Sequence, residues 1–139
     1  MALLLLSVAA VIEATTGIAL IISPQTVTSL LLGADLAVAG IAVGRVAGIA
    51  LLSLGLGCWL SRRDLNKTAA LTAMLSYNLL VTAYLMYLGL GGELVGVLLW
   101  PAIAIHAVLT LLFANVRVMI RSPSNHTRDS VFAVSADFC

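Results

Sequence analysis

Four long apolar runs, separated by short polar stretches, dominate this sequence of 139 residues. A helix that crosses the hydrocarbon core of a bilayer needs about 20 mostly apolar residues, because its backbone N–H and C=O groups must be hydrogen-bonded within the segment. Four segments meet that length, at about residues 2–22, 36–60, 69–88 and 94–116. The sequence therefore predicts an all-α polytopic membrane protein in which residues 1–118 form a bundle of four transmembrane helices.

The composition also favours lipid as the surrounding solvent. Hydrophobic residues make up 62% of the chain and charged residues only 9%. Soluble domains are about 45–50% apolar and about a quarter charged. The net charge of +1 and the aromatic content of 6% provide neither a basic stripe nor a stacking platform for nucleic acid. We expect the lipid bilayer, and not nucleic acid, to be the main partner.

Proline and glycine mark the expected ends of the spans. The first helix should end at Pro24, because proline restricts the residue before it. Residues 25–33 mix polar and apolar side chains, which suits one or two helical turns in the headgroup plane, but an ordinary loop fits equally well. The third helix should end in the glycine-rich turn 89–92. In the fourth, Pro101 removes a hydrogen bond to the carbonyl of Val97, which predicts a kink.

The basic residues outside the spans lie in two places, the loop between the second and third spans and the segment after the fourth. They are Arg62, Arg63, Lys67, Arg117, Arg121 and Arg128. The other two loops carry only the acids Asp35 and Glu93. Basic residues near helix ends stay on the cytoplasmic side. The pattern predicts a plasma (inner) membrane protein with both termini inside.

The C-terminal tail, residues 119–139, is polar and lacks the apolar content to fold alone. We expect it to be flexible. Its Asn125-His126-Thr127 glycosylation sequon should remain unused on the cytoplasmic side.

Glycines recur at every fourth position of the second span, at Gly40, Gly44 and Gly48. Small residues at this spacing let another helix approach closely. The stripe is therefore expected to be a packing surface for a helix of the same chain or for a second copy. A homo-oligomer or a larger membrane complex stays open as an alternative.

Two ionisable residues lie inside the first two spans. Glu13 is about halfway along the first, and Arg45 is about a third of the way along the second from its outer end. Because the two helices run antiparallel, their depths should be similar. An ionisable side chain at the bilayer centre costs roughly 2.5–3.5 kcal/mol even on lenient scales and usually pairs inside the bundle. Glu13 and Arg45 are therefore the expected partners.

The other two spans bring Asn78 and His106 to about the same level. Further polar groups near them are Tyr77, Thr16, Thr82 and Thr110. The cluster of Glu13, Arg45, Asn78 and His106 has two interpretations. It is a pocket that binds a small molecule or a proton, or it is a satisfied network that fixes helix register. The two are equally supported for Glu13 with Arg45, whereas His106 alone favours the structural role.

Motifs that signal catalysis, cofactors or metals are missing from the sequence. It has no nucleophile motif, glycine-rich phosphate loop, HExxH, CxxCH or paired-carboxylate signature. Its two cysteines, Cys58 and Cys139, do not form a ligand or disulfide pattern. We therefore expect no cofactor and no metal, and catalysis has no positive support.

The run Gly44-Arg45-Val46-Ala47-Gly48 lies within the second span and follows a first helix that ends near a proline and a short Val/Leu segment. In this layout, residues 5–118 resemble the DoxX-like superfamily of small four-helix membrane proteins. The resemblance implies that fold, and some members are linked to redox or quinone systems. The segment Val11–Gly17, with Glu13, is similar to the first helix of small multidrug resistance transporters. In contrast to those, Arg45 here would compete for the glutamate and repel a cation.

The function expected from the cluster is binding or sensing of a small molecule or a proton. One alternative is a proton-coupled small-molecule transporter. Another is an accessory subunit of a larger membrane complex, such as a redox complex, onto which the glycine stripe docks. A membrane enzyme for lipid or quinone substrates would need Glu13 and His106 together at a cleft open to lipid.

Overall fold

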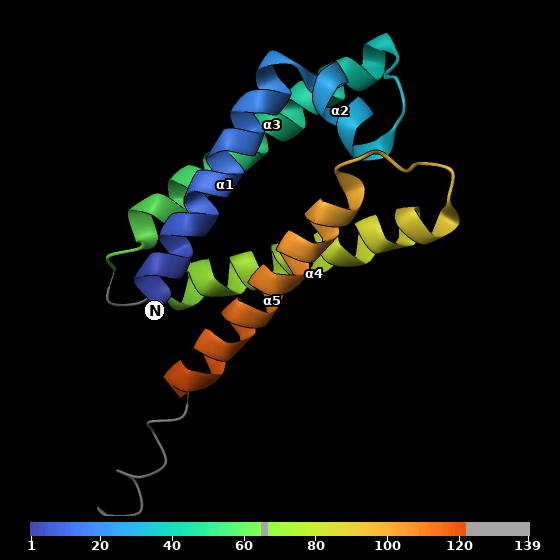
Figure 1. Ribbon diagram of the computed structural model, residues 1–139. Coiled ribbons are helices and arrows are strands. Elements are labelled where there is room, and N and C mark those ends of the chain that lie inside the picture. The colour runs from blue at the N-terminus through green and yellow to red at the C-terminus, as the bar shows by residue number, and fades with distance from the viewer. Residues whose placement is uncertain (65–66, 122–139) are drawn as a thin grey trace, which may run out of the picture.

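A computed structural model describes residues 1–64 and 67–121. They form five helices and no strand: α1 (Ala2–Ile22), α2 (Pro24–Leu32), α3 (Val38–Ser61), α4 (Thr68–Gly91) and α5 (Leu99–Arg121) (Figure 1). All but the short α2 are long and apolar enough to cross a membrane. The chain is therefore an all-α integral membrane protein with four candidate spans. Most of the predicted tail, residues 122–139, lies outside the described residues.

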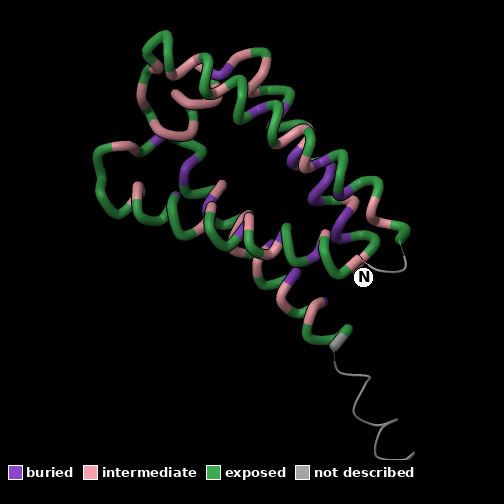
Figure 2. The backbone as a smooth tube through the Cα atoms, turned by 180° about the vertical axis from the view of Figure 1, so that it is seen from behind, coloured by how far each residue is buried: buried purple, intermediate pink, exposed green. Residues whose placement is uncertain are grey.

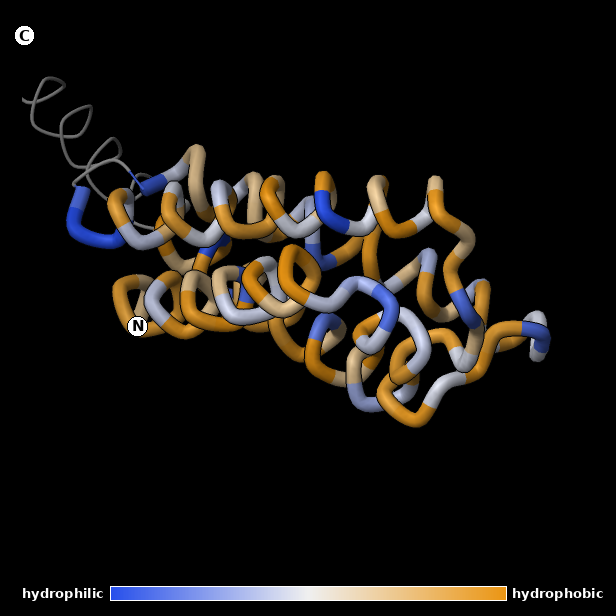
Figure 3. The backbone as a smooth tube through the Cα atoms, turned by 90° about the horizontal axis from the view of Figure 1, so that it is seen from above, coloured by the Kyte–Doolittle hydropathy of each residue, from blue (hydrophilic) through white to orange (hydrophobic). Residues whose placement is uncertain are grey.

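The four long helices form two antiparallel pairs, α1 with α3 and α4 with α5 (Figure 1). Buried positions follow the sides on which helices face one another, while the outward sides are exposed (Figure 2). Those outward sides are largely apolar, and the hydrophilic stretches lie mainly near the ends of the helices (Figure 3). This distribution suits helices surrounded by lipid.

Small residues allow the backbones of α1 and α3 to touch. A Cβ atom added at Gly48 would lie 2.7 Å from the carbonyl oxygen of Gly17, and one added at Gly55 would lie 2.9 Å from that of Ala10. Gly44 faces the ring of Pro24, and Gly40 meets only Leu36, four residues earlier. The predicted glycine stripe thus packs inside the chain, at Gly48 on α1 and at Gly44 on α2.

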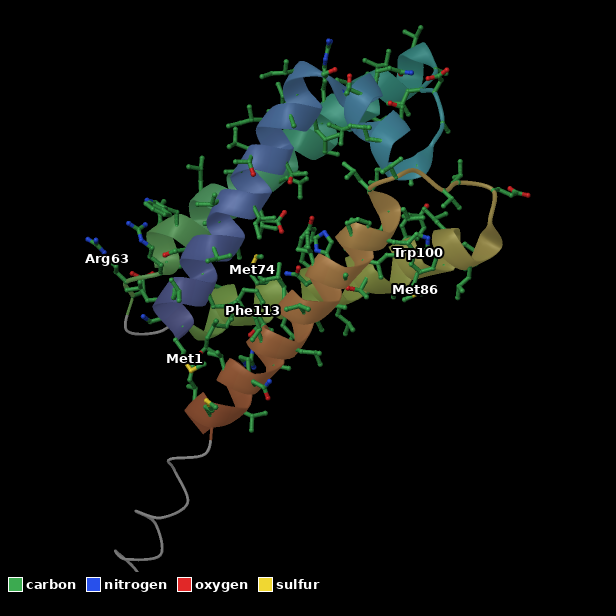
Figure 4. The ribbon with its side chains drawn as sticks, viewed as in Figure 1. Met1, Arg63, Met74, Met86, Trp100 and Phe113 are labelled. Atoms are coloured by element: carbon green, nitrogen blue, oxygen red, sulfur yellow. The ribbon has the colours of Figure 1, made fainter. Side chains whose placement is uncertain are left out.

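At the end that holds the N-terminus, a hydrophobic cluster joins the two pairs. Leu6 of α1, Leu71 and Met74 of α4, and Phe113 of α5 are fully buried in it. Met74 and Phe113 lie near each other in this part of the bundle (Figure 4). Such a cluster shields apolar side chains that the pairs could not cover separately.

At the opposite end the two pairs are joined by a backbone seam. The N–H of Leu98 donates to the carbonyl of Leu30 over 2.8 Å, and the N–H of Gly96 donates to that of Leu31 over 3.2 Å. These carbonyls lie in the last turn of α2, where they have no partner within their own helix. Gly33 ends α2 with φ of 70°, and the carbonyl oxygen of Val95 lies close to it. The segment 95–98 thus completes the C-terminal end of α2.

The helix bounds follow the prediction closely at α1 and depart from it at α5. The ordered helix Pro24–Leu32 decides between the two interpretations of residues 25–33. Helix α5 starts at Leu99, not near residue 94, because Gly96 and Leu98 bond to α2. Pro101 is therefore in the first turn of α5, where the N–H that it lacks would have no helical partner. The kink was predicted because Pro101 cannot donate a hydrogen bond to the carbonyl of Val97. Val97 precedes α5, so no helical bond is lost there and the basis of that prediction was wrong.

Candidate functional site

A cavity of about 350 Å³ lies between the two helix pairs. Its apolar wall includes Leu20 of α1, Val27 and Leu31 of α2, and Val81 and Leu85 of α4. The polar residues that border it are Thr16, Thr28, Tyr77 and His106. Since the hydrophobic cluster and the backbone seam hold the pairs together on either side, the cavity is a preformed feature of the fold.

Asn78 and His106 are joined directly across the interface of α4 and α5. The Oδ1 atom of Asn78 lies 2.8 Å from Nδ1 of His106, and Asn78 is fully buried. The Nδ2 group of Asn78 donates to the carbonyl of Met74 over 2.8 Å. A carbonyl can only accept, so the amide nitrogen must face Met74 and the amide oxygen must face the imidazole. Nδ1 of His106 therefore carries a proton and donates it to Asn78.

Nε2 is then the acceptor of the neutral imidazole. His106 is half-buried and borders the cavity. Across the described residues, Glu13 Oε1 is the single fully buried side-chain nitrogen or oxygen atom without a hydrogen-bond partner. Nε2 of His106 also has no such partner, so it is not fully buried. The ring of Tyr77 meets that of His106 edge-on, with centroids 5.9 Å apart and an interplanar angle of 78°. The cavity thus borders an imidazole whose orientation is fixed by the hydrogen bond between its Nδ1 atom and Asn78.

Glu13 lies beside the cavity and does not border it. Its neighbours Ile12 and Thr16 line the cavity, whereas the side chain of Glu13 is only 1% exposed. The hydroxyl of Tyr77 approaches the carboxyl group from α4, but Oε1 has no hydrogen-bond partner among the described residues. A buried carboxylate oxygen without a partner is costly, so Oε1 of Glu13 can still accept a hydrogen bond.

Arg45 is not part of this cluster. Its side chain is exposed, and no ion pair forms between it and Glu13. The register of the two helices gives the reason, since Gly48 lies against Gly17. Arg45 is three residues before Gly48, which in an antiparallel pair places it three residues beyond Gly17, while Glu13 is four residues before Gly17. Seven residues are about two helical turns, so the pair expected from the sequence is too far apart to form.

The three threonines near the cluster differ in what their side chains contact. The hydroxyl of Thr82 donates to the carbonyl of Asn78 over 2.7 Å, and that of Thr110 donates to the carbonyl of His106 over 2.8 Å. Both bonds stay within one helix and do not extend a shared polar face. Thr16 alone of the predicted threonines borders the cavity.

Sequence reasoning missed the contribution of α2 and of the start of α5. Val27, Thr28 and Leu31 line the cavity together with Leu98 and Pro101. The alternation of polar and apolar residues in 25–33 was a usable signal for an interfacial helix, but nothing in it indicated a cavity. The described residues contain no group of three or more His, Cys, Asp or Glu side chains that could hold a metal ion.

Comparison of the chain with models of known protein families, with characterised proteins and with solved structures found no match. The DoxX-like resemblance stays a prediction. The cavity and its polar groups therefore carry the functional argument.

Proposed function

We propose that the protein binds a small lipophilic molecule in the cavity between its two helix pairs, and that it acts by binding or sensing this molecule. One observation carries the proposal: an apolar cavity of about 350 Å³ is bordered by His106, which Asn78 holds in one orientation. Small-molecule sites are typically concave and mostly apolar, with volumes of roughly 300–1,000 Å³ and a few placed polar groups. The cavity has these properties.

A purely structural role accounts for Asn78 but not for the space beside His106. Asn78 is buried, and its bonds to Met74 and His106 fix the contact of α4 with α5. A network that served packing alone would need no cavity on the other side of the imidazole, because closely packed helices gain dispersion energy that a void forfeits. The cavity is what favours binding.

The test is to fill the cavity without changing its polar residues. Ala102 borders the cavity, whereas Ala104 on the same helix is exposed on an outward side. Ala102→Phe and Ala104→Phe are therefore a matched pair. A library of small lipophilic compounds is screened for those that raise the melting temperature of the wild type in mild detergent.

The proposal expects compounds that stabilise the wild type and Ala104→Phe but leave Ala102→Phe unshifted. Binding at 100 times the dissociation constant should add about 2.7 kcal/mol to stability, which a melt resolves. Stabilisation that persists in Ala102→Phe places the ligand elsewhere and contradicts the proposal. The absence of any stabilising compound contradicts it as well.

Proton coupling is a second candidate, favoured by Glu13 beside the cavity, whose Oε1 atom has no hydrogen-bond partner among the described residues. A ligand that alters the surroundings of Glu13 through Tyr77 should then change the number of protons bound. The measurement is proton uptake or release on ligand addition in weakly buffered detergent solution, for the wild type and Glu13→Gln. A signal lost in Glu13→Gln supports coupling, and equal signals, or none in either protein, contradict it.

The accessory-subunit alternative gains nothing from the glycine stripe. Gly48 and Gly44 already pack on α1 and α2, so they offer no docking groove to a partner. Association of the chain with a second copy or with a larger complex would have to use another surface.

For orientation, we propose that the end holding Met1 faces the cytoplasm of a plasma (inner) membrane. Arg63 lies at that end together with Met1 (Figure 4), and Arg117 bonds to Thr72 there. Lys67 is the only lysine of the chain. An amine reagent that cannot cross membranes should label Lys67 in opened cells and not in intact ones. Labelling of intact cells would reverse the orientation.

A further inference from the structure

We infer that the cavity takes a lipophilic molecule that donates a hydrogen bond, such as a phenol or another apolar alcohol, to Nε2 of His106. The inference deepens the proposed function and rests on it. It follows from the direction in which three successive hydrogen-bonding groups must point, from Met74 through Asn78 to the imidazole.

The direction is set at the carbonyl of Met74, which can only accept. It requires the NH2 group of Asn78, which leaves the Asn78 oxygen as the atom 2.8 Å from Nδ1 of His106. That oxygen also only accepts, so Nδ1 must donate. In a neutral imidazole the second nitrogen then has a lone pair and no hydrogen. Asn78 thus makes His106 an acceptor toward the cavity.

The remaining polar groups do not supply the donor that Nε2 requires. The hydroxyl of Thr110 donates its hydrogen to the carbonyl of His106, and the hydroxyl of Thr82 donates its hydrogen to the carbonyl of Asn78. Tyr77 meets His106 through its ring and directs its hydroxyl toward Glu13. Thr16 and Thr28 also border the cavity, but no group of the described residues forms a hydrogen bond with Nε2.

The wall of the cavity sets the rest of the ligand's character. Leu20, Val81 and Leu85 provide apolar surface, and the edge of the Tyr77 ring lies beside the imidazole. A molecule with an apolar body buries that body against this wall, while its hydroxyl meets Nε2. An ether or hydrocarbon of equal size would leave Nε2 unpaired, which costs about as much as a lost hydrogen bond.

The test uses 4-propylphenol and 4-propylanisole, which share a ring and chain but differ in a hydroxyl hydrogen. The protein carries ¹⁵N-labelled histidine and His126→Gln, so that His106 is the only histidine left. Nitrogen NMR at mildly alkaline pH, in mild detergent, reports which ring nitrogen bears the hydrogen. Titration with each compound reports binding and its effect on Nε2.

The expected result is a hydrogen on Nδ1 and a lone pair on Nε2. The phenol should shift the Nε2 signal and bind about tenfold more tightly than the anisole, in line with one hydrogen bond. Ala102→Phe should abolish the effect of the phenol on Nε2, and Ala104→Phe should keep it.

Two outcomes overturn the inference and leave the proposed function standing. One is a hydrogen on Nε2, and the other is equal affinity for the two compounds with loss of both in Ala102→Phe. If neither compound binds while Nδ1 carries the hydrogen, the inference fails together with the proposed function for ligands of this size. Binding that is lost in Ala102→Phe therefore separates failure of the inference alone from failure of the proposed function.

Discussion

The amide oxygen of Asn78 on α4 lies 2.8 Å from Nδ1 of His106 on α5, and this contact determines both helix packing and imidazole chemistry. It is the only side-chain hydrogen bond between α4 and α5 at the level of the cavity among the described residues. Because Asn78 is fully buried, no water competes for it. The same bond therefore stabilises the pair and leaves Nε2 as the acceptor at the cavity.

Asn78→Leu should destabilise the protein. The substitution keeps the branched shape of the side chain but leaves Nδ1 of His106 without its partner. Interhelical hydrogen bonds in membranes are worth about 0.6 kcal/mol on average and up to about 1.7, so a loss of about 1 kcal/mol is expected. Unfolding in mixed micelles of mild and denaturing detergent measures it. Asn115→Leu, at an exposed position of α5, is the control and should change stability little.

Gly48→Ala should also destabilise the protein, because its Cβ would lie 2.7 Å from the carbonyl oxygen of Gly17 and 2.9 Å from the backbone nitrogen of Ile21. Separating the backbones of α1 and α3 should cost about 1–3 kcal/mol. Gly57→Ala on the same helix meets nothing within 4 Å. It should be neutral or slightly stabilising, since alanine favours helices. Equal effects of the two substitutions on unfolding would contradict the packing described for α3.

The backbone seam can be tested with two glycines that share a conformation. Gly33 and Gly92 have φ of 70° and 75°, so alanine is strained at both. Only at Gly33 would the Cβ also meet another segment, at 2.9 Å from the carbonyl oxygen of Val95. Gly33→Ala should therefore cost more stability than Gly92→Ala and should speed hydrogen exchange at the N–H of Leu98. Equal costs and unchanged exchange would show that the seam does not depend on this contact.

Glu13→Gln should raise stability, by about 1 kcal/mol or more. Burying a carboxylate costs several kcal/mol, more than the roughly 1–3 kcal/mol for an amide, and Oε1 of Glu13 has no hydrogen-bond partner among the described residues to offset that cost. Glu93→Gln is the control, because Glu93 is exposed. Loss of stability in Glu13→Gln, measured by detergent unfolding at neutral pH, would mean that Oε1 has a partner that the fold does not show.

Arg45→Leu and Glu13→Gln should act independently. Arg45 is exposed and about two turns away from Glu13 along the helix pair. The double variant should therefore equal the sum of the single ones within about 0.5 kcal/mol. A larger coupling in this cycle would restore the ion pair that the sequence suggested.

The absence of an ion pair between Glu13 and Arg45 shows what the sequence alone could not predict. Depth along each helix can be counted, and it correctly placed Asn78 and His106 near one level. The register between two helices depends on which small residues meet, and the contact of Gly48 with Gly17 moves Arg45 away from Glu13. A count along separate helices contains no information on that contact.

The start of α5 illustrates a second limit. Residues 94–98 are as apolar as the membrane-spanning segment that follows them, and they were included in the predicted span for that reason. The N–H groups of Gly96 and Leu98 instead bond to carbonyls of α2, which are far away in the sequence. Local propensity cannot reveal a partner that only the fold brings close. Bounds such as those of α1, which are set by Pro24 and by length alone, were predictable.

The hydrogen bonds from Gly96 and Leu98 to α2 also bear on how the protein is made. Helix α2 is synthesised before α4 and α5, so the carbonyls of Leu30 and Leu31 reach the membrane surface long before their donors leave the ribosome. Until then, only water or headgroups can satisfy them. Water and headgroups at the bilayer interface thus stabilise the end of α2 during synthesis. A chain arrested before residue 96 would contain α1, α3 and α4 but would lack the two N–H donors that complete α2.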